Sequence, residues 1–327
     1  MSPPFPVELY EAIFRFLDHP DLAAVARTST STGPIALRVL YRVLRVAPSP
    51  PHAPPSVVLT LSTRPDIARH VRHFTIALDH SAALFHSFYR RLATALSSMS
   101  ALVSLDIFID AGSWVLPDNR VYPQLQHFAS SFPFDSRVAA FFTNAPVLES
   151  AQVESAASPL PSLAQASLLR LAEFTGCSSA AAAVVPGRPV ESIHINSGDV
   201  TEDMVPALAK STAMVTVLSL TTSSAPVPLL QVLGQHLPHI MYLRITSNCN
   251  LPAPPTSIFY EQVAGALAFF PNLQSFELSG MCWSSSKKPD EPQRVWQSQP
   301  FTTDFVSQDD AELHLDLYSN TADFFFS

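Results

Sequence analysis

A short apolar pattern recurs along this chain, and it constrains the fold more than any other feature. Its form is apolar-x-x-apolar-x-apolar, with clear copies at 71–76, 102–107, 190–195, 215–220, 240–245 and 273–278. The central residues Ile193, Leu218 and Leu243 follow one another at intervals of 25 residues, and Phe276 follows after 33. Alternating apolar residues over so few positions predict short strands with one buried face. Recurrence at such a period indicates stacked repeats that bury their apolar faces against one another.

Helix-like stretches precede the clear copies, at 89–96, 204–209, 229–237 and 260–270. A helix, a turn and a short strand form the unit of a leucine-rich-repeat solenoid, so we predict an α/β chain with a degenerate solenoid of this kind. An ordinary α/β sheet is the alternative. Its buried parallel strands would read as longer Val/Ile runs, which favours the solenoid. Between 110 and 190 the pattern weakens, and 125–128, 148–151 and 168–171 are candidates for degenerate copies.

Residues 5–46 predict three short amphipathic helices. The first begins at Pro6, a favoured first helical position, and has Glu8 in its first turn. Residues 18–20 end this helix and open the second, and Gly33-Pro34 separates the second from the third. The third is expected to carry Leu37, Leu40, Tyr41 and Leu44. About forty residues cannot bury three apolar stripes alone, so this surface packs on the following domain or docks a partner.

The residues of this module decide between those two possibilities. The strings Phe5-Pro-Val-Glu-Leu-Tyr-Glu-Ala-Ile-Phe-Arg-Phe-Leu17 and Asp21-Leu-Ala-Ala-Val-Ala-Arg27 resemble an F-box, and 36–42 looks like its fungal form. The segment 185–196 is similar to a repeat junction of fungal, basidiomycete-type F-box proteins, and the whole resemblance covers 5–283. Thr28 and Thr32 depart from the family, which usually has an apolar and an aromatic residue there.

The resemblance implies a partner for the helical module. In that family the box binds the Skp-type adaptor subunit of cullin-based SCF ubiquitin ligases. The residues that would supply the apolar contact are Pro6, Leu9, Ile13, Phe14, Leu17 and Leu22.

The domain plan follows from these patterns. We predict an F-box-like helical module over 1–46, a Pro-rich linker over 47–56 and the repeat region over 57–283. The tail, 284–327, carries 3 basic and 8 acidic residues with poor periodicity, and we predict that most of it is irregular or disordered. Trp283 and Trp296 hint at a degenerate last repeat.

Composition narrows the class of partner. The net charge is -8, and charged residues make up only 14% of the chain, so neither a nucleic-acid backbone nor an anionic membrane is an expected partner. Cys177, Cys249 and Cys282 lie far apart without a CxxC pair, which predicts a reducing compartment and no zinc site. With no signal-peptide pattern and no long apolar run, we expect a cytoplasmic or nuclear protein.

Catalytic patterns were sought without result. There is no GxSxG, P-loop, GxGxxG or HExxH pattern, and the pairs His70/His73 and His236/His239 are expected to be solvated or turn residues. We therefore expect neither an enzyme nor a metal or other cofactor. A solenoid binds through the outward residues of its strands, which predicts a substrate-recognition strip. Its members are His194, Asn196, Ser219, Thr221, Arg244, Thr246, Glu277 and Ser279.

Three hypotheses follow. The first is a substrate-recognition adaptor of an SCF-type ubiquitin ligase, in which the box docks the Skp-type adaptor and the repeats hold a protein substrate. The second is a repeat scaffold for protein–protein interaction whose box no longer binds the ligase. The third, ranked behind both, is a hydrolase or ligand-binding α/β protein with coincidental repeats, which a deep apolar pocket with convergent titratable groups would support.

Overall fold

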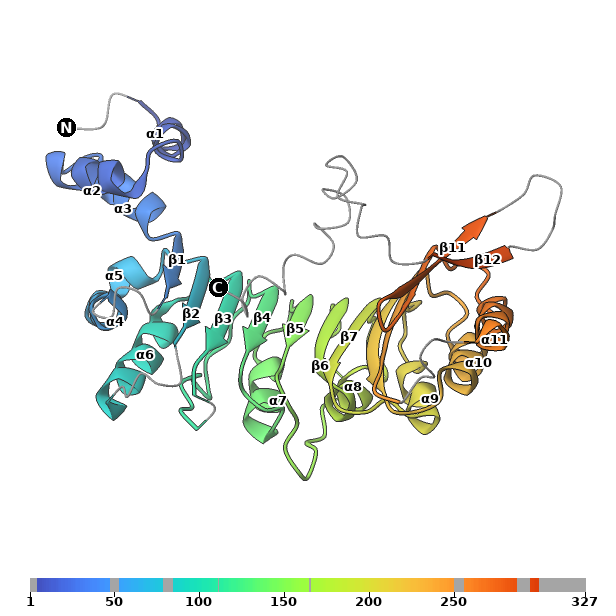
Figure 1. Ribbon diagram of the computed structural model, residues 1–327. Coiled ribbons are helices and arrows are strands. Elements are labelled where there is room, and N and C mark those ends of the chain that lie inside the picture. The colour runs from blue at the N-terminus through green and yellow to red at the C-terminus, as the bar shows by residue number, and fades with distance from the viewer. Residues whose placement is uncertain are drawn as a thin grey trace.

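The structure is a computed structural model that describes residues 5–47, 53–78, 85–110, 112–164, 166–249, 256–286 and 295–299. Within those ranges lie eleven α-helices, one short 3-10 helix and twelve strands that form a single sheet. Strands β1–β10 pair in chain order and in parallel, and β11 and β12 complete the sheet in antiparallel pairing. The chain is therefore α/β, as predicted. Figure 1 shows the strands side by side, with α4–α11 along one side of the sheet.

The elements of the first half have the following bounds: α1 Val7–Phe14, α2 His19–Thr28, α3 Gly33–Leu40, β1 Val43–Val46, α4 Ala53–Thr63, α5 Pro65–Ala68, β2 His73–Ala77, α6 His86–Ser98, β3 Ser104–Phe108, β4 His127–Ser130, α7 Ser136–Thr143 and β5 Ser150–Gln152.

Those of the second half are β6 Glu173–Cys177, α8 Ser178–Val184, β7 Ser192–Ser197, the 3-10 helix Glu202–Met204, α9 Val205–Leu208, β8 Val217–Thr222, α10 Pro226–His236, β9 Tyr242–Ser247, α11 Ser257–Leu267, β10 Ser275–Leu278, β11 Met281–Ser286 and β12 Val295–Gln299. The four helix-like stretches named from the sequence fall on α6, α9, α10 and α11.

The recurring pattern forms the inner face of the sheet. Its first residues stand two positions before each strand and are all buried: Val71, Leu102, Leu125, Leu148, Leu171, Val190, Val215, Ile240 and Leu273. Its central residues stand in register from strand to strand: Phe74, Leu105, Phe128, Ala151, Phe174, Ile193, Leu218, Leu243 and Phe276. This register ladder makes one continuous core from Val46 to Trp296.

The degenerate copies between 110 and 190 are real strands with a regular period. Phe128, Ala151 and Phe174 follow Leu105 at intervals of 23 residues. The copies expected at 125–128 and 148–151 are confirmed on β4 and β5. The one expected at 168–171 is wrong by three residues, because Leu171 is the first residue of that copy and Phe174 on β6 is its central residue. The apolar pattern is weak in this part of the sequence because small residues fill two of its positions. Ala151 is the central residue of the β5 copy, and Gly176 is the third residue of the β6 copy.

Gly176 has a packing reason. A Cβ at this position would lie 3.0 Å from both the Phe174 ring and Val153 Cγ2, closer than ordinary contacts. The absence of a side chain therefore lets the inner layers of neighbouring units come together.

The N-terminal helices form a bundle with a core of its own. Phe14, Leu22, Ile35 and Ala36 are buried together, apart from the main core. Asp18 caps α2, and its carboxylate accepts a hydrogen bond of 2.9 Å from Asp21 N. A Cβ on Gly33 would lie 2.8 Å from the Ala26 carbonyl oxygen, so the close approach of α2 and α3 depends on this glycine. Figure 1 shows the bundle beyond β1 at one end of the sheet.

Three sequence-based boundaries differ from the structure. The third helix ends at Leu40, and Leu44 lies on β1, where extended Val43–Val46 pairs with β2. The first strand thus begins inside the segment assigned to the helical module, 1–46. Part of the proposed linker, 47–56, is helical from Ala53, the first residue of α4.

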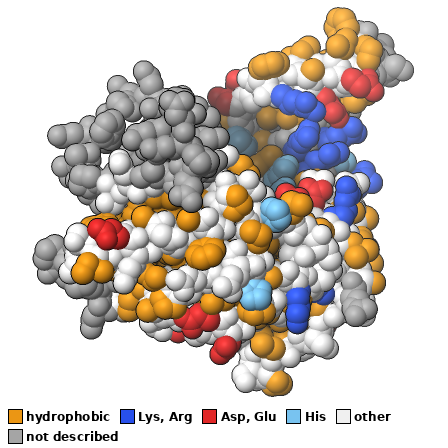
Figure 2. Space-filling model, turned by 90° about the vertical axis from the view of Figure 1, so that its right-hand side faces the viewer, with side chains coloured by type: hydrophobic (Ala, Val, Ile, Leu, Met, Phe, Trp, Pro, Cys, Tyr) orange, Lys and Arg blue, Asp and Glu red, His pale blue; other side chains and the backbone are white. Residues whose placement is uncertain are grey.

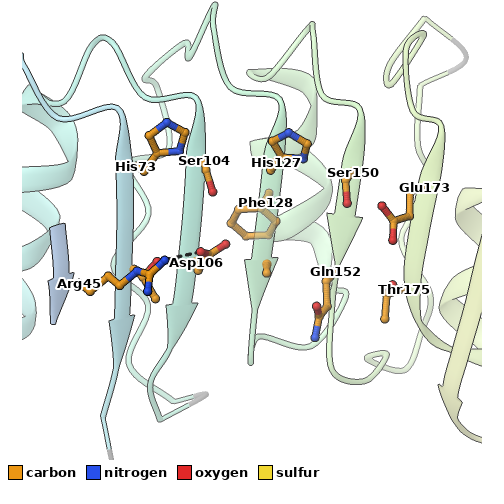
Figure 3. Close-up of a pocket in the computed structure, with 12 residues that line it drawn as sticks. Arg45, His73, Ser104, Asp106, His127, Phe128, Ser150, Gln152, Glu173 and Thr175 are labelled. Atoms are coloured by element: carbon orange, nitrogen blue, oxygen red, sulfur yellow. Dashed lines mark hydrogen bonds between the residues drawn. The ribbon is translucent and has the colours of Figure 1, made fainter. Parts of the chain in front are cut away.

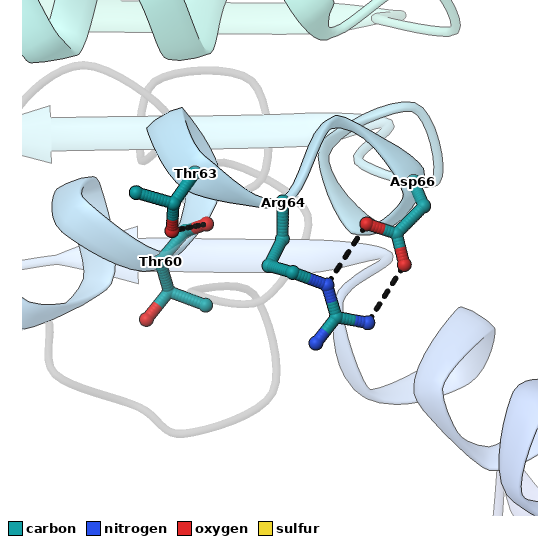
Figure 4. Close-up of polar contacts among 4 residues, drawn as sticks. All are labelled: Thr60, Thr63, Arg64 and Asp66. Atoms are coloured by element: carbon teal, nitrogen blue, oxygen red, sulfur yellow. Dashed lines mark hydrogen bonds and ion pairs between the residues drawn. The ribbon is translucent and has the colours of Figure 1, made fainter.

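Local polar contacts surround the break between α4 and α5 (Figure 4). Arg64 donates from Nε and Nη2 to the two carboxylate oxygens of Asp66, at 2.9 and 2.7 Å, and Thr63 Oγ1 donates to the Thr60 carbonyl at 3.1 Å. Pro65 is the first residue of α5 and lacks the backbone N–H that would continue α4, so the helix ends here and α5 carries Ile67 into the core.

Two short parts of the predicted tail, 284–286 and 295–299, are strands. Trp283 on β11 and Trp296 on β12 are buried, and the two strands pair as a hairpin against β10. The Trp283 ring packs against Phe276 at 5.1 Å, so the hairpin covers the last parallel strand. Residues 300–327 lie outside the described part of the chain.

Candidate functional site

The strand face opposite the helices is hollowed over β1–β6. The hollow has a volume of about 410 Å³. Its lining comes from six strands and, apart from the inward residue Phe128, from their outward positions: Arg45, His73, Thr75, Ser104, Asp106, His127, Ala129, Ser150, Gln152, Glu173 and Thr175. Figure 3 shows ten of these side chains on successive strands. Residues more than 120 positions apart share one surface, because parallel pairing aligns the same position of each unit.

Two registered rows make this lining. The first row holds His73, Ser104, His127, Ser150 and Glu173. The second holds, in the same strand order, Arg45, Thr75, Asp106, Ala129, Gln152 and Thr175. The second row begins with Arg45 on β1 and has an acid, Asp106, on β3, whereas the first row alternates histidine with serine and ends on an acid, Glu173, at β6. The hollow is therefore polar along its length and uneven in charge.

Burial changes the titration of several groups here. It raises the pKa of Asp106, which a hydrogen bond of 2.9 Å from Thr75 Oγ1 partly opposes. Burial also lowers the pKa of His73, and the neighbouring Arg42 lowers it further. The imidazole is therefore mostly neutral at pH 7.

The sequence-predicted strip continues the second row beyond the hollow. His194, Ser219, Arg244 and Glu277 follow Thr175 in register on β7–β10, and Thr221 pairs with Thr246. Arg244 Nε lies 3.4 Å from Glu277 Oε1. Asn196 is exposed on β7, and Ser279 follows β10, where its Oγ accepts from Ser247 N at 2.8 Å. The structure thus brings the strip together, but places the hollow on strands whose outward residues the predicted strip did not include.

The residues of the hollow were missed for a definable reason. Of its six strands, β4, β5 and β6 carry degenerate copies of the pattern and β1 carries none, while β2 and β3 carry clear copies that lie outside the series spaced by 25 residues. The 23-residue interval from Leu105 to Phe174 was the signal that could have found β4, β5 and β6, because it sets the register independently of which residue fills each position.

A histidine, a serine and an acid lie close together on β6 and β7, and their geometry can be compared with that of a catalytic triad. His194 Nε2 lies 2.9 Å from Ser192 Oγ and 3.9 Å from Glu173 Oε1. A serine–histidine–acid triad needs the serine and the acid on different ring nitrogens, because one nitrogen takes the serine proton while the acid orients the ring through the N–H of the other. Here both approach Nε2, so the trio lacks that geometry. Among the described residues, no group of three His, Cys, Asp or Glu side chains is arranged to hold a metal ion.

A second candidate surface lies on α1. Leu9 and Ile13 are 51% and 57% exposed, and Phe16, just after the helix, is 90% exposed. Pro6 is also exposed, Leu17 is half-buried, and Phe14 and Leu22 lie inside the bundle core. Of the six residues predicted to contact an adaptor, Phe14 and Leu22 therefore shape the bundle from within, because their side chains are already covered. Figure 2 shows hydrophobic side chains over the outer part of the raised lobe that this bundle forms.

No helix in the described ranges combines the length and the apolar character that crossing a membrane requires. No protein-family model matches the chain, and no curated protein matches it at a significant level.

Proposed function

We propose that this chain is a substrate-recognition adaptor of an SCF-type ubiquitin ligase, in the cytoplasm or nucleus. In this proposal α1–α3 act as an F-box that docks a Skp-type adaptor subunit and, through it, the cullin ligase. The strand face holds a protein substrate. Ubiquitin transfer then depends on proximity, and this chain contributes binding rather than chemistry.

The observation that carries the proposal is the apolar surface of α1. Leu9 and Ile13 lie one helical turn apart on a helix whose Phe14 already fills the bundle core. Because α1 buries one apolar face in the bundle and exposes another, a partner protein could cover the exposed face. Covering a leucine or isoleucine side chain contributes about 1.5–3 kcal/mol when burial is complete. The two positions are also those that the F-box resemblance assigns to the adaptor contact.

The sheet supports the second half of the proposal. We interpret its helix–strand units as degenerate leucine-rich repeats, because strands pair in chain order and one buried ladder runs through all of them. We call the repeats degenerate because some connections, such as that from β5 to β6, contain no helix in their described residues. Such an array offers a long polar strand face, the surface that repeat proteins use to bind other proteins.

The test is co-expression of the full chain with a fungal Skp-type adaptor, followed by affinity purification and size exclusion. We expect a one-to-one complex that the double substitution Leu9→Asp with Ile13→Asp abolishes. Both side chains are more than half exposed, so the bundle should still fold, which far-UV circular dichroism checks. The matched control is Leu169→Asp with Ile258→Asp, two side chains 62% and 64% exposed and remote from α1. A complex that survives the α1 substitutions would refute this docking surface.

A second candidate is a repeat scaffold whose box no longer engages the ligase. The observation in its favour is Thr28, an exposed residue where the family usually has an apolar one. Its hydroxyl donates to the Val25 carbonyl at 2.9 Å and caps its own helix instead of offering apolar area. Absence of any adaptor complex with a folded, unmodified chain would move this candidate to first place.

A further inference from the structure

Arginine side chains gather where the bundle meets the sheet. Arg42 lies between α3 and β1, Arg72 directly precedes β2, and the two backbones are joined by a hydrogen bond of 2.9 Å from Arg72 N to Arg42 O. Arg45 is on β1, and Arg15 follows α1 close enough to interact electrostatically with Arg42. Figure 2 shows basic side chains gathered at the base of the lobe that the bundle forms. Like charges this close repel one another, so the cluster favours an anion.

The neighbouring acids offset part of this charge, since Asp106 on β3 interacts electrostatically with Arg45. Glu11 interacts with Arg42, but its carboxylate already accepts a hydrogen bond and ion pair of 2.7 Å from Arg38. The four ion pairs formed among the described residues include none of Arg15, Arg42, Arg45 and Arg72.

The cluster opens onto the hollow. Arg45 lines it directly and stands in register with Thr75, and Arg72 precedes His73, the first lining residue on β2. From there the lining continues past Asp106 on β3, His127 on β4 and the neutral side chains of β5 to Glu173 on β6. Five strand intervals of about 4.8 Å make this path roughly 24 Å long, the span of about seven extended residues. An extended segment across these strands would meet positive charge first and negative charge last.

We propose that the hollow over β1–β6 binds an acidic segment of a partner protein, with its Asp and Glu side chains against Arg42, Arg45 and Arg72. This inference rests on the proposed function, since it names the class of substrate that the strand face would take. Asp106 and Glu173 in the same hollow disfavour a nucleic acid, whose phosphates would continue along the whole path and meet both carboxylates. A peptide can place its acids at the β1–β2 end and neutral or basic residues beyond them.

The test uses the full chain and a fluorescent glutamate peptide, three glutamates followed by five glutamines, with a peptide of eight glutamines for comparison, and binding is followed by anisotropy. The net charge of -8 repels an acidic peptide, so binding requires a local basic site. We expect Arg42→Gln with Arg45→Gln to weaken binding at least fivefold. The matched control, Arg90→Gln with Arg91→Gln, removes the same charge from exposed positions on α6 and should change binding less than twofold. Should the first double variant misfold, the exposed Arg45→Gln alone carries the test.

Removing a negative charge from the hollow tests the same inference in the opposite direction. Asp106→Asn removes a carboxylate from the hollow and is expected to tighten binding of the glutamate peptide, with added salt weakening every complex. Equal weakening by both arginine pairs, or no binding of the glutamate peptide, would overturn the proposal. So would tighter binding of an eight-nucleotide oligothymidine that depends on Arg42 and Arg45, which would make the hollow a nucleic-acid site.

The two proposals can fail separately. Leu9→Asp with Ile13→Asp should leave peptide binding unchanged, and the arginine substitutions in the hollow should leave the adaptor complex intact. Peptide binding without any adaptor complex would keep this inference and reject the ligase role, whereas the reverse result would keep the ligase role and reject the acidic partner.

Discussion

Replacement of Phe128 by alanine tests whether one register ladder holds the sheet together. Phe128 is 1% exposed at the centre of β4, and its ring lies 4.8 Å from the Phe141 ring and 5.8 Å from the Phe142 ring on α7. Its neighbour on β5 is Ala151, a side chain too small to fill the space that the ring would leave. The site therefore collapses poorly, which is the condition that makes a core truncation costly.

The magnitude follows from those contacts. Truncation of a buried phenylalanine costs about 3–5 kcal/mol of unfolding free energy, and each lost ring pair contributes roughly 0.5–1.5 kcal/mol beyond the buried area. With two ring pairs and little room for collapse, we expect a loss of about 4–5 kcal/mol for Phe128→Ala. Since each repeat contacts only its neighbours, the loss should weaken the units around β4 before those near β9.

The assay is urea unfolding of the full chain followed by far-UV circular dichroism, with amide hydrogen exchange to locate the weakened units. Phe85→Ala is the matched control, because that ring is 83% exposed just before α6, and its loss should stay below about 0.5 kcal/mol. A loss below about 1.5 kcal/mol for Phe128→Ala, or one no larger than that of the control, would refute the ladder as the main source of stability.

Two further predictions concern the hollow and the bundle. Burial raises the pKa of Asp106, so its contribution to stability is fully present below the unfolded pKa and is lost as pH rises through the folded pKa. At pH 7 Asp106→Asn should therefore unfold at a higher urea concentration than the unmodified chain, and this difference should disappear near pH 4. A difference in midpoint that does not depend on pH would contradict a buried carboxylate. If the bundle docks an adaptor as proposed, Thr28→Leu should tighten the complex about fivefold or more, since a covered leucine contributes roughly 1–2 kcal/mol. Calorimetric titration with the adaptor would measure the affinity, and an unchanged affinity would place Thr28 outside the contact.

The sequence by itself determined the local elements and their inner faces. Alternation at 71–76 or 215–220 requires a strand with two or three buried residues, because side chains of a strand point to opposite sides. Likewise Asp18-His19-Pro20 and Gly33-Pro34 set the breaks between the three N-terminal helices, since capping and proline geometry act within a few residues. The α/β class and most strands were readable on these grounds.

Only the tertiary structure decided which outward residues meet. Arg45 and Glu173 share a hollow because five parallel pairings fix their register, and outward polar positions carry no apolar period that would reveal this. Ala151 and Gly176 hid two strands for a related reason, since large neighbours such as Phe128 and Phe174 fill the space that these small residues leave. The hairpin of β11 and β12 likewise depended on Trp283 packing against Phe276, a contact between strands that no short sequence window contains.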